Sequence, residues 1–158
     1  ILAAKPAGTI GAVEAVSTPK AEELRGLLDR IDLLFVNADE AATLSGRAVR
    51  GEADAEAAAR ALADRGVGSV VVNLGPAGAG LLSDGIWGTA PAAPADIVDV
   101  TGAGDASVGG YLLGQLSGRS PPDALRLGRA AAALALESAD AVPPGLDLTT
   151  LLARAGMR

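Results

Sequence analysis

The stretch Asp99-Val100-Thr101-Gly102-Ala103-Gly104-Asp105 decides the fold of this chain. The β-branched residues over 97–101 are typical of the end of a strand, Gly-Ala-Gly predicts a tight turn, and 106–116 predicts a helix. Glycines at such a turn let the backbone approach a ligand, and the free N–H groups of the first helical turn favour an anion. Asp105 would then accept a proton from an attacking hydroxyl, which indicates phosphoryl transfer.

Other interpretations of this turn exist. Glycine-rich turns also serve as plain connections between a strand and a helix. The turn is not a Walker A loop, because no Gly-Lys-Ser/Thr follows it, and Gly102, Gly104 and Ser107 do not match the GxGxxG spacing of a dinucleotide site. The motif therefore needs support from elsewhere in the chain.

Two further polar turns provide that support. The apolar run 31–36 predicts a buried parallel strand and is followed by Asn37-Ala38-Asp39-Glu40, and the strand predicted at 69–74 leads into Gly75-Pro76-Ala77-Gly78. Open α/β sheets bind ligands at the carboxyl ends of their strands, so these turns predict one site. The structural alternative is that Asn37 caps a helix while Asp39 and Glu40 interact favourably with the positive end of its dipole.

The rest of the pattern alternates strands with helices, which predicts a single α/β domain over 1–158 with a mostly parallel sheet flanked by helices. The remaining expected strands are 1–4, 9–16 and a hairpin of 79–83 with 86–89 about Asp84-Gly85. The remaining expected helices are 20–28 capped by Ser17, a short segment to Leu44, one through Arg65, 122–137, and 146–155 capped by Asp147.

The composition excludes several classes of function. The 158 residues carry 13 basic and 19 acidic side chains, a net charge of −6, and only Phe35, Trp87 and Tyr111 are aromatic, which disfavours a nucleic-acid partner. Without Cys or His the chain has no disulfide, no thiolate or histidine metal site and no Ser-His-Asp triad. We see no membrane span and no signal peptide, and we expect a soluble, cytoplasmic protein. Residue 1 is Ile, and we expect the polypeptide to begin inside a larger fold.

In order and spacing, the three turns resemble the C-terminal half of the ribokinase-like (PfkB) carbohydrate and nucleoside kinases, and the Asp99–Asp105 motif is the most specific part of that resemblance. The resemblance covers the whole chain and includes 130–141, which is similar to a late helix near the adenine pocket. The segments 16–21 and 31–40 resemble the pseudouridine-kinase branch in particular.

The resemblance implies a role for each matching residue. Asp105 would be the general base, and the amides of Gly102, Ala103 and Gly104 would form the anion hole. The nucleotide-binding residues would be Asn37, Asn73, Gly75 and Gly78. Glu40 would serve Mg²⁺ through water, and Asp99 with Thr101 would bind a monovalent cation such as K⁺. The co-substrate would be ATP and the acceptor a small sugar or nucleoside.

The chain also departs from the family pattern. Asn73 replaces a common Thr, Glu14 replaces a strand-end Asp, and Ser107 replaces an aromatic residue. The family's N-terminal half, with most sugar-binding residues and the lid, has no counterpart. Substrate recognition and closure against water therefore lie outside what the motifs predict.

Three functional interpretations follow. The first is the nucleotide-binding half of an ATP-dependent kinase, the second is a non-catalytic nucleotide-binding remnant or module of the same fold, and the third is an unrelated dinucleotide-binding domain. An incomplete sheet exposes an apolar edge, so we expect a homo-oligomer or association with the missing N-terminal half.

Overall fold

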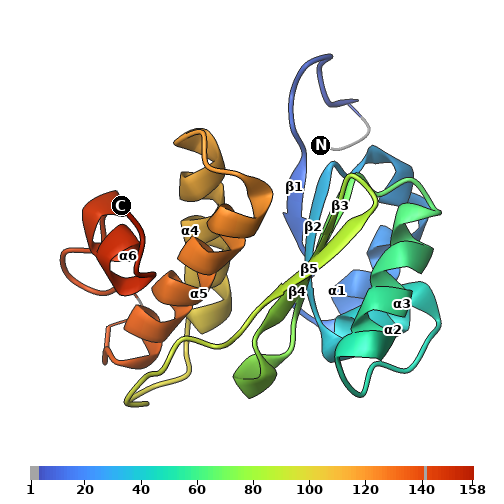
Figure 1. Cartoon of the computed structure of the whole chain (residues 1–158). Coiled ribbons are helices and arrows are strands. Elements are labelled where there is room, and N and C mark those ends of the chain that lie inside the picture. Colours follow the sequence, from blue (N-terminus) through green and yellow to red (C-terminus); the bar gives the residue numbers. More distant parts are fainter. Residues whose placement is uncertain (1–3, 141) are drawn as a thin grey trace. The chain divides into compact units, whose positions relative to one another are not determined.

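A computed structural model describes residues 4–140 and 142–158 (Figure 1). The chain divides into two units, the first ending at Thr89 and the second beginning at Ala90. The strand predicted at 1–4 lies outside the described residues apart from Ala4.

The first unit combines a sheet with helices on one of its faces (Figure 1). Its elements in chain order are β1 (Ala12–Glu14), α1 (Thr18–Glu23), the 3₁₀ turns η2 (Leu24–Gly26) and η3 (Leu28–Arg30), β2 (Leu33–Asn37), α2 (Ala38–Ser45), α3 (Glu52–Ala63), β3 (Ser69–Asn73), the 3₁₀ turn η4 (Gly75–Ala77), β4 (Ala79–Ser83) and β5 (Ile86–Ala90).

The five strands follow one another in the order β1-β2-β3-β4-β5. β1 with β2 and β2 with β3 pair in parallel, whereas β3 and β4 are antiparallel, so the sheet is mixed. The predicted hairpin turn is present: Asp84 and Gly85 both have positive φ, 51° and 74°, which is the backbone that a two-residue type I′ turn requires. The predicted α/β class, a sheet flanked by helices, is confirmed.

The core of the first unit lies between the sheet and helices α1 to α3. Alternate residues of the strands, such as Leu34 and Val36 of β2, pack in one cluster with the buried face of α3. That face consists of Ala55, Ala58, Ala59 and Leu62. Three of these four are alanines, whose short side chains allow α3 to pack close to the sheet, and the loop before α3 shares a pocket with the strand ends.

The predicted helix over 20–28 is wrong in two respects. α1 ends at Glu23 and continues as 3₁₀ turns that include Gly26, a residue that weakens a helix, and Ser17 makes no side-chain capping bond. Pro19 lies in the first turn, as expected.

The second unit is helical and contains α4 (Ala103–Leu116), α5 (Pro121–Leu136) and α6 (Leu148–Arg154). Leu127, Ala130, Ala131 and Leu151 form the centre of its core. α6 begins at its predicted cap, where the Asp147 carboxylate accepts a bond from the Thr150 N–H at 2.8 Å.

The strand predicted over 97–101 is wrong. Ile97, Val98 and Val100 are 66%, 64% and 69% exposed, and the segment pairs with no strand. Its N–H groups bond elsewhere: those of Val98 and Asp99 both donate to the Leu136 carbonyl at the end of α5. β-branched residues favour a strand only where a neighbouring strand completes the ladder, and this segment has none.

Candidate functional site

The N-terminus of α2 is fixed by a reciprocal pair of hydrogen bonds. The Asn37 Oδ1 accepts from the Glu40 N–H at 2.9 Å, and the Glu40 Oε2 accepts from the Asn37 N–H at 2.9 Å. This is a capping box, and it satisfies two N–H groups that the helix itself leaves without acceptors. The structural role considered for Asn37 is thus confirmed, and Glu40 is 4% exposed beneath it.

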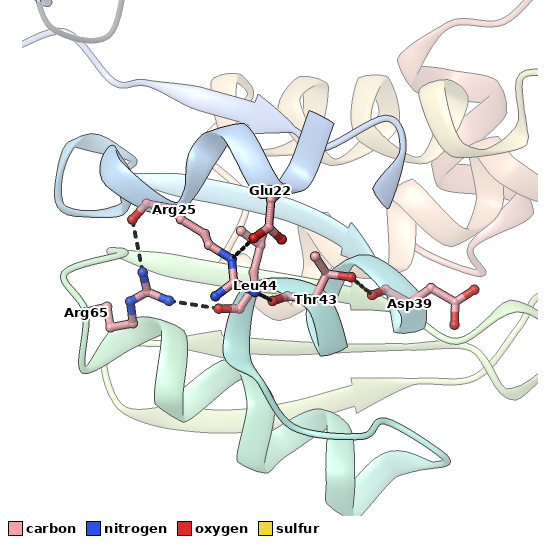
Figure 2. Close-up of polar contacts among 6 residues, drawn as sticks. All are labelled: Glu22, Arg25, Asp39, Thr43, Leu44 and Arg65. Atoms are coloured by element: carbon pink, nitrogen blue, oxygen red, sulfur yellow. Dashed lines mark hydrogen bonds and ion pairs between the residues drawn. The ribbon is translucent and has the colours of Figure 1, made fainter. Parts of the chain in front are cut away.

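The other end of α2 is held by two arginines (Figure 2). Arg25 donates to the Thr43 carbonyl and forms an ion pair with Glu22, while Arg65 donates to the carbonyls of Leu44 and Arg25. Cations at a helix C-terminus bind the carbonyls that have no partner within the helix, and they interact favourably with the negative end of the helix dipole. Both ends of α2 are therefore fixed, and the side chains at its start have a defined position.

Asn37 and Asn73 end two neighbouring parallel strands and are partners in the β2–β3 register. They border a pocket of about 300 Å³. Its lining consists of Asn37, Ala38, Asp39, Val49, Arg50, Gly51, Asn73, Leu74, Gly75 and Ala77. The sequence-based expectation that the turns after these strands lie together is confirmed for this pair.

The turn after β3 is shaped by two glycines with positive φ, Gly75 at 57° and Gly78 at 98°. Gly78 donates to the Gly75 carbonyl at 3.0 Å, and its own carbonyl accepts from Leu74 at 2.9 Å. Gly75 lines the pocket, whereas Gly78 is buried and shapes the turn from behind. Residues with a side chain rarely adopt such backbone angles, which explains why glycine occupies both positions.

The residues of the opening motif lie in the second unit, at the start of α4. Gly102 is the N-cap with a φ of 79°, and the helix begins at Ala103, three residues before the predicted start. Asp105 is therefore in the first helical turn, where its side chain is exposed. By helix geometry the N–H groups of Gly104 and Asp105 have no acceptor within α4, so an anion can bind there.

The segment before this helix is ordered by Asp99. Its Oδ1 accepts from both the N–H and the hydroxyl of Thr101, each at 2.9 Å. Both bonds hold the pKa of Asp99 below its ordinary value, and the bond from the backbone N–H has the larger effect. Asp99 therefore fixes the conformation of the residues leading into Gly102.

The candidate residues form two groups, one in each unit. Asn37, Asn73 and Gly75 share the pocket of the first unit, whereas Glu40, buried in the first turn of α2, is not among the lining residues. Asp99, Thr101 and 102–105 lie together in the second unit. Asp39, which the sequence placed in the candidate turn without a binding role, and Arg50, which sequence reasoning missed, also line the pocket. Arg50 had only one signal in the sequence, its place just before the first residues of a helix.

Within the described residues, no three Asp, Glu, His or Cys side chains gather closely enough to hold a metal ion. Each helix of the described chain is also too short or too polar to cross a membrane.

Comparison with known proteins identifies the family. A family model described as "pfkB family carbohydrate kinase" matches residues 1–147. The chain therefore belongs to the PfkB family of carbohydrate kinases, as the motifs predicted.

Individual relatives are longer than this chain. It is 45% identical over 92 residues to a 1-phosphofructokinase of Haloferax volcanii, covering 58% of this chain and 30% of that protein. It is 34% identical over 128 residues to 1-phosphofructokinase of Escherichia coli K12, covering 80% of this chain and 41% of the relative. The chain thus spans less than half the length of these relatives.

Solved structures confirm the ribokinase-like fold. A structure of Arabidopsis thaliana ribokinase complexed with ribose and ATP matches 85% of this chain and 44% of its own, with 29% identity and a TM-score of 0.76. A putative sugar kinase from Clostridium perfringens matches 89% of this chain and 45% of its own, with 25% identity and a TM-score of 0.83.

Proposed function

We propose that the protein to which this chain belongs transfers a phosphoryl group from ATP to a hydroxyl of a small sugar or nucleoside. The observation that carries the proposal is the start of α4, where the exposed Asp105 carboxylate stands in the same helical turn as N–H groups without helical acceptors. A base beside an anion site is the arrangement that phosphoryl transfer to a hydroxyl needs. The relatives named as sugar kinases support the same reaction class.

In this proposal Asp105 accepts the proton of the acceptor hydroxyl. The hydroxyl oxygen forms a bond to the γ-phosphorus as the bond from that phosphorus to the bridging oxygen breaks, and ADP leaves with the electron pair. The N–H groups of Gly102, Ala103 and Gly104 would face the negative charge that spreads over the transferring group, and the Ala103 N–H would leave the Val100 carbonyl, to which it donates at 3.5 Å. Gly102 with its positive φ allows the backbone to turn there.

The nucleotide is assigned to the pocket of the first unit. Asn37 and Asn73 contribute amide groups, and the Gly75 backbone brings the turn after β3 to the pocket. Asn73 stands where the family commonly has Thr, and its amide offers a donor of similar reach. Gly78 acts indirectly by fixing that turn.

The family implies Mg²⁺, and the residues present fit a site in which the ion is held mainly by water and phosphate. Since no three acidic side chains gather within the described residues, a metal here would keep most of its waters and contact the phosphates. Such an ion would neutralise phosphate charge, and Glu40 is the proposed carboxylate behind its water shell. The exposed oxygens of Asp99 and Thr101 are the proposed ligands of a monovalent cation such as K⁺.

The identity of the acceptor is a narrower part of the proposal. The relatives include 1-phosphofructokinases, a cytidine kinase and ribokinases, so both sugars and nucleosides are represented. The segments 16–21 and 31–40 favour a pseudouridine kinase. We also propose that 1–158 works as one domain, that the protein acts in the cytoplasm, and that it forms an oligomer or pairs with an N-terminal half.

Calorimetric titration with ATP, with and without Mg²⁺, tests the nucleotide part. We expect saturable binding that Mg²⁺ strengthens. A transfer assay with γ-labelled ATP then compares ribose, a hexose phosphate, cytidine and pseudouridine as acceptors, with the N-terminal half supplied. Binding of ATP without transfer to any acceptor would contradict the kinase and favour the non-catalytic module.

A further inference from the structure

The pocket of the first unit has a single cation among its lining residues, Arg50. We propose that Arg50 binds the phosphate groups of the nucleotide and so sets the preference of this pocket for polyphosphate over the bare nucleoside. The inference rests on the proposed function, because it deepens the nucleotide assignment of the same pocket.

The first argument is the state of the Arg50 side chain. Within residues 4–140 and 142–158, its guanidinium makes no hydrogen bond or ion pair, whereas those of Arg25, Arg60 and Arg65 in the same unit bind carbonyls or carboxylates. Asp39 lines the same pocket, yet the two charged side chains do not pair. Arg50 is therefore free to meet a ligand, and its planar fork matches two phosphate oxygens at once.

The second argument is the position of its backbone. The Arg50 N–H donates to the Asp54 Oδ2 at 3.0 Å, which ties this loop residue to the first turn of α3. The side chain thus extends from a fixed point at the pocket wall. A cation held this way loses less conformational freedom on binding than one on a mobile loop.

The third argument is the balance of charge around the pocket. The chain carries a net charge of −6, and Asp39 contributes a carboxylate to the lining itself. A phosphate chain entering this pocket meets that negative charge, and only Arg50 opposes it among the lining residues. Gly51, the N-cap of α3, makes no side-chain capping bond; Glu52 and Asp54 stand in the first turn of this helix, where the Asp54 carboxylate accepts the Arg50 N–H, so Arg50 is the group that must attract a phosphate.

The proposal predicts selectivity in a set of matched ligands. Calorimetry would measure binding of ATP, adenosine and inorganic tripolyphosphate to the parent chain and to Arg50→Gln. We expect Arg50→Gln to lower the affinity for ATP and for tripolyphosphate about tenfold, since a charge-assisted bond is lost, and to leave adenosine binding unchanged. Arg50→Lys is expected to restore part of the phosphate affinity.

Two further variants locate the effect. Arg47→Gln, on the same loop but outside the pocket, should bind all three ligands like the parent. Asp39→Asn should raise tripolyphosphate affinity about twofold in the absence of Mg²⁺, because a repulsive charge is removed. Thermal unfolding of each variant shows whether the fold is retained.

The outcomes separate the inference from the proposed function. Equal loss of ATP and adenosine binding in Arg50→Gln, or no loss of either, overturns the phosphate role of Arg50. Tripolyphosphate binding that depends on Arg50, without any binding of ATP or adenosine, supports the anion site and contradicts the nucleotide function. If the parent binds none of the three ligands, both fail.

Discussion

Gly110 of α4 lies against the backbone of Leu127 in α5, so closely that a Cβ atom on Gly110 would be 2.8 Å from the Leu127 carbonyl oxygen. It would also be 2.7 Å from the Cβ atom of Ala131. Distances below 3.0 Å require a shift of the helices, because the neighbouring atoms belong to backbone and to a short side chain. Helices α4 and α5 therefore pack through glycine.

This contact predicts opposite effects for two adjacent glycines. Gly110→Ala should lower the free energy of unfolding by about 1–3 kcal/mol through overpacking. Gly109→Ala, where nothing lies within 4 Å of the added atom, should raise it by up to about 1 kcal/mol through helix propensity. Urea unfolding of both variants measures this. Equal effects in the two would contradict the packing.

The capping box predicts that Asn37 has separable structural and binding roles. Asn37→Ala should cost about 1 kcal/mol of stability, because the Glu40 N–H loses its acceptor. Asn37→Asp keeps an accepting oxygen, so stability should remain near that of the parent while a negative charge enters the pocket and weakens ATP binding. Chemical unfolding and nucleotide titration are measured in parallel. Should Asn37→Asp bind ATP normally, the amide has no role in the pocket.

Asp105→Asn should lower the rate of phosphoryl transfer by about 10²-fold or more while ATP affinity is kept, because the base is lost and the N–H groups stay in place. Asp84→Asn is the matched control, since Asp84 is an exposed carboxylate in the β4–β5 turn and Asn also accepts its positive φ. Transfer rate and ATP affinity are measured on the protein supplied with its N-terminal half. A parallel fall of both quantities in Asp105→Asn would reject the role of base.

The bonds from Thr101 predict the pH dependence of the turn before α4. The bonds from Thr101 hold the folded-state pKa of Asp99 below its ordinary value, so they are fully present above the ordinary pKa and are lost as the pH falls through the folded pKa. Thr101→Val removes the hydroxyl donor and should raise the pKa of Asp99 toward its ordinary value. NMR titration of the Asp99 carboxyl and the Thr101 amide checks both statements. An unchanged pKa in Thr101→Val would show that the hydroxyl bond is unimportant.

The sequence predicted best those parts of the site whose position follows from backbone geometry alone. Asn37 and Asn73 meet because parallel strands bring their carboxyl ends to one edge, which follows from the order of elements. The strand over 97–101 was predicted from β-branched residues, but a strand needs a partner, and here the α5 carbonyl of Leu136 takes the N–H groups instead. Arg50 was missed because its place in the pocket depends on the packing of α3 against the sheet. Whether the pocket and Asp105 act together stays a prediction.

The fixed ends of α2 have a consequence for local unfolding. Its N-terminus is closed by Asn37 and Glu40, and its last carbonyls are bound by Arg25 from η2 and by Arg65 from the segment after α3 (Figure 2). Fraying of α2 from its C-terminus must break the bonds to those two segments, so its amide hydrogens should exchange with solvent together with theirs as one cooperative unit. Sequence changes far from the pocket, in η2 or after α3, should then alter how often this unit opens and so how long the pocket keeps its shape.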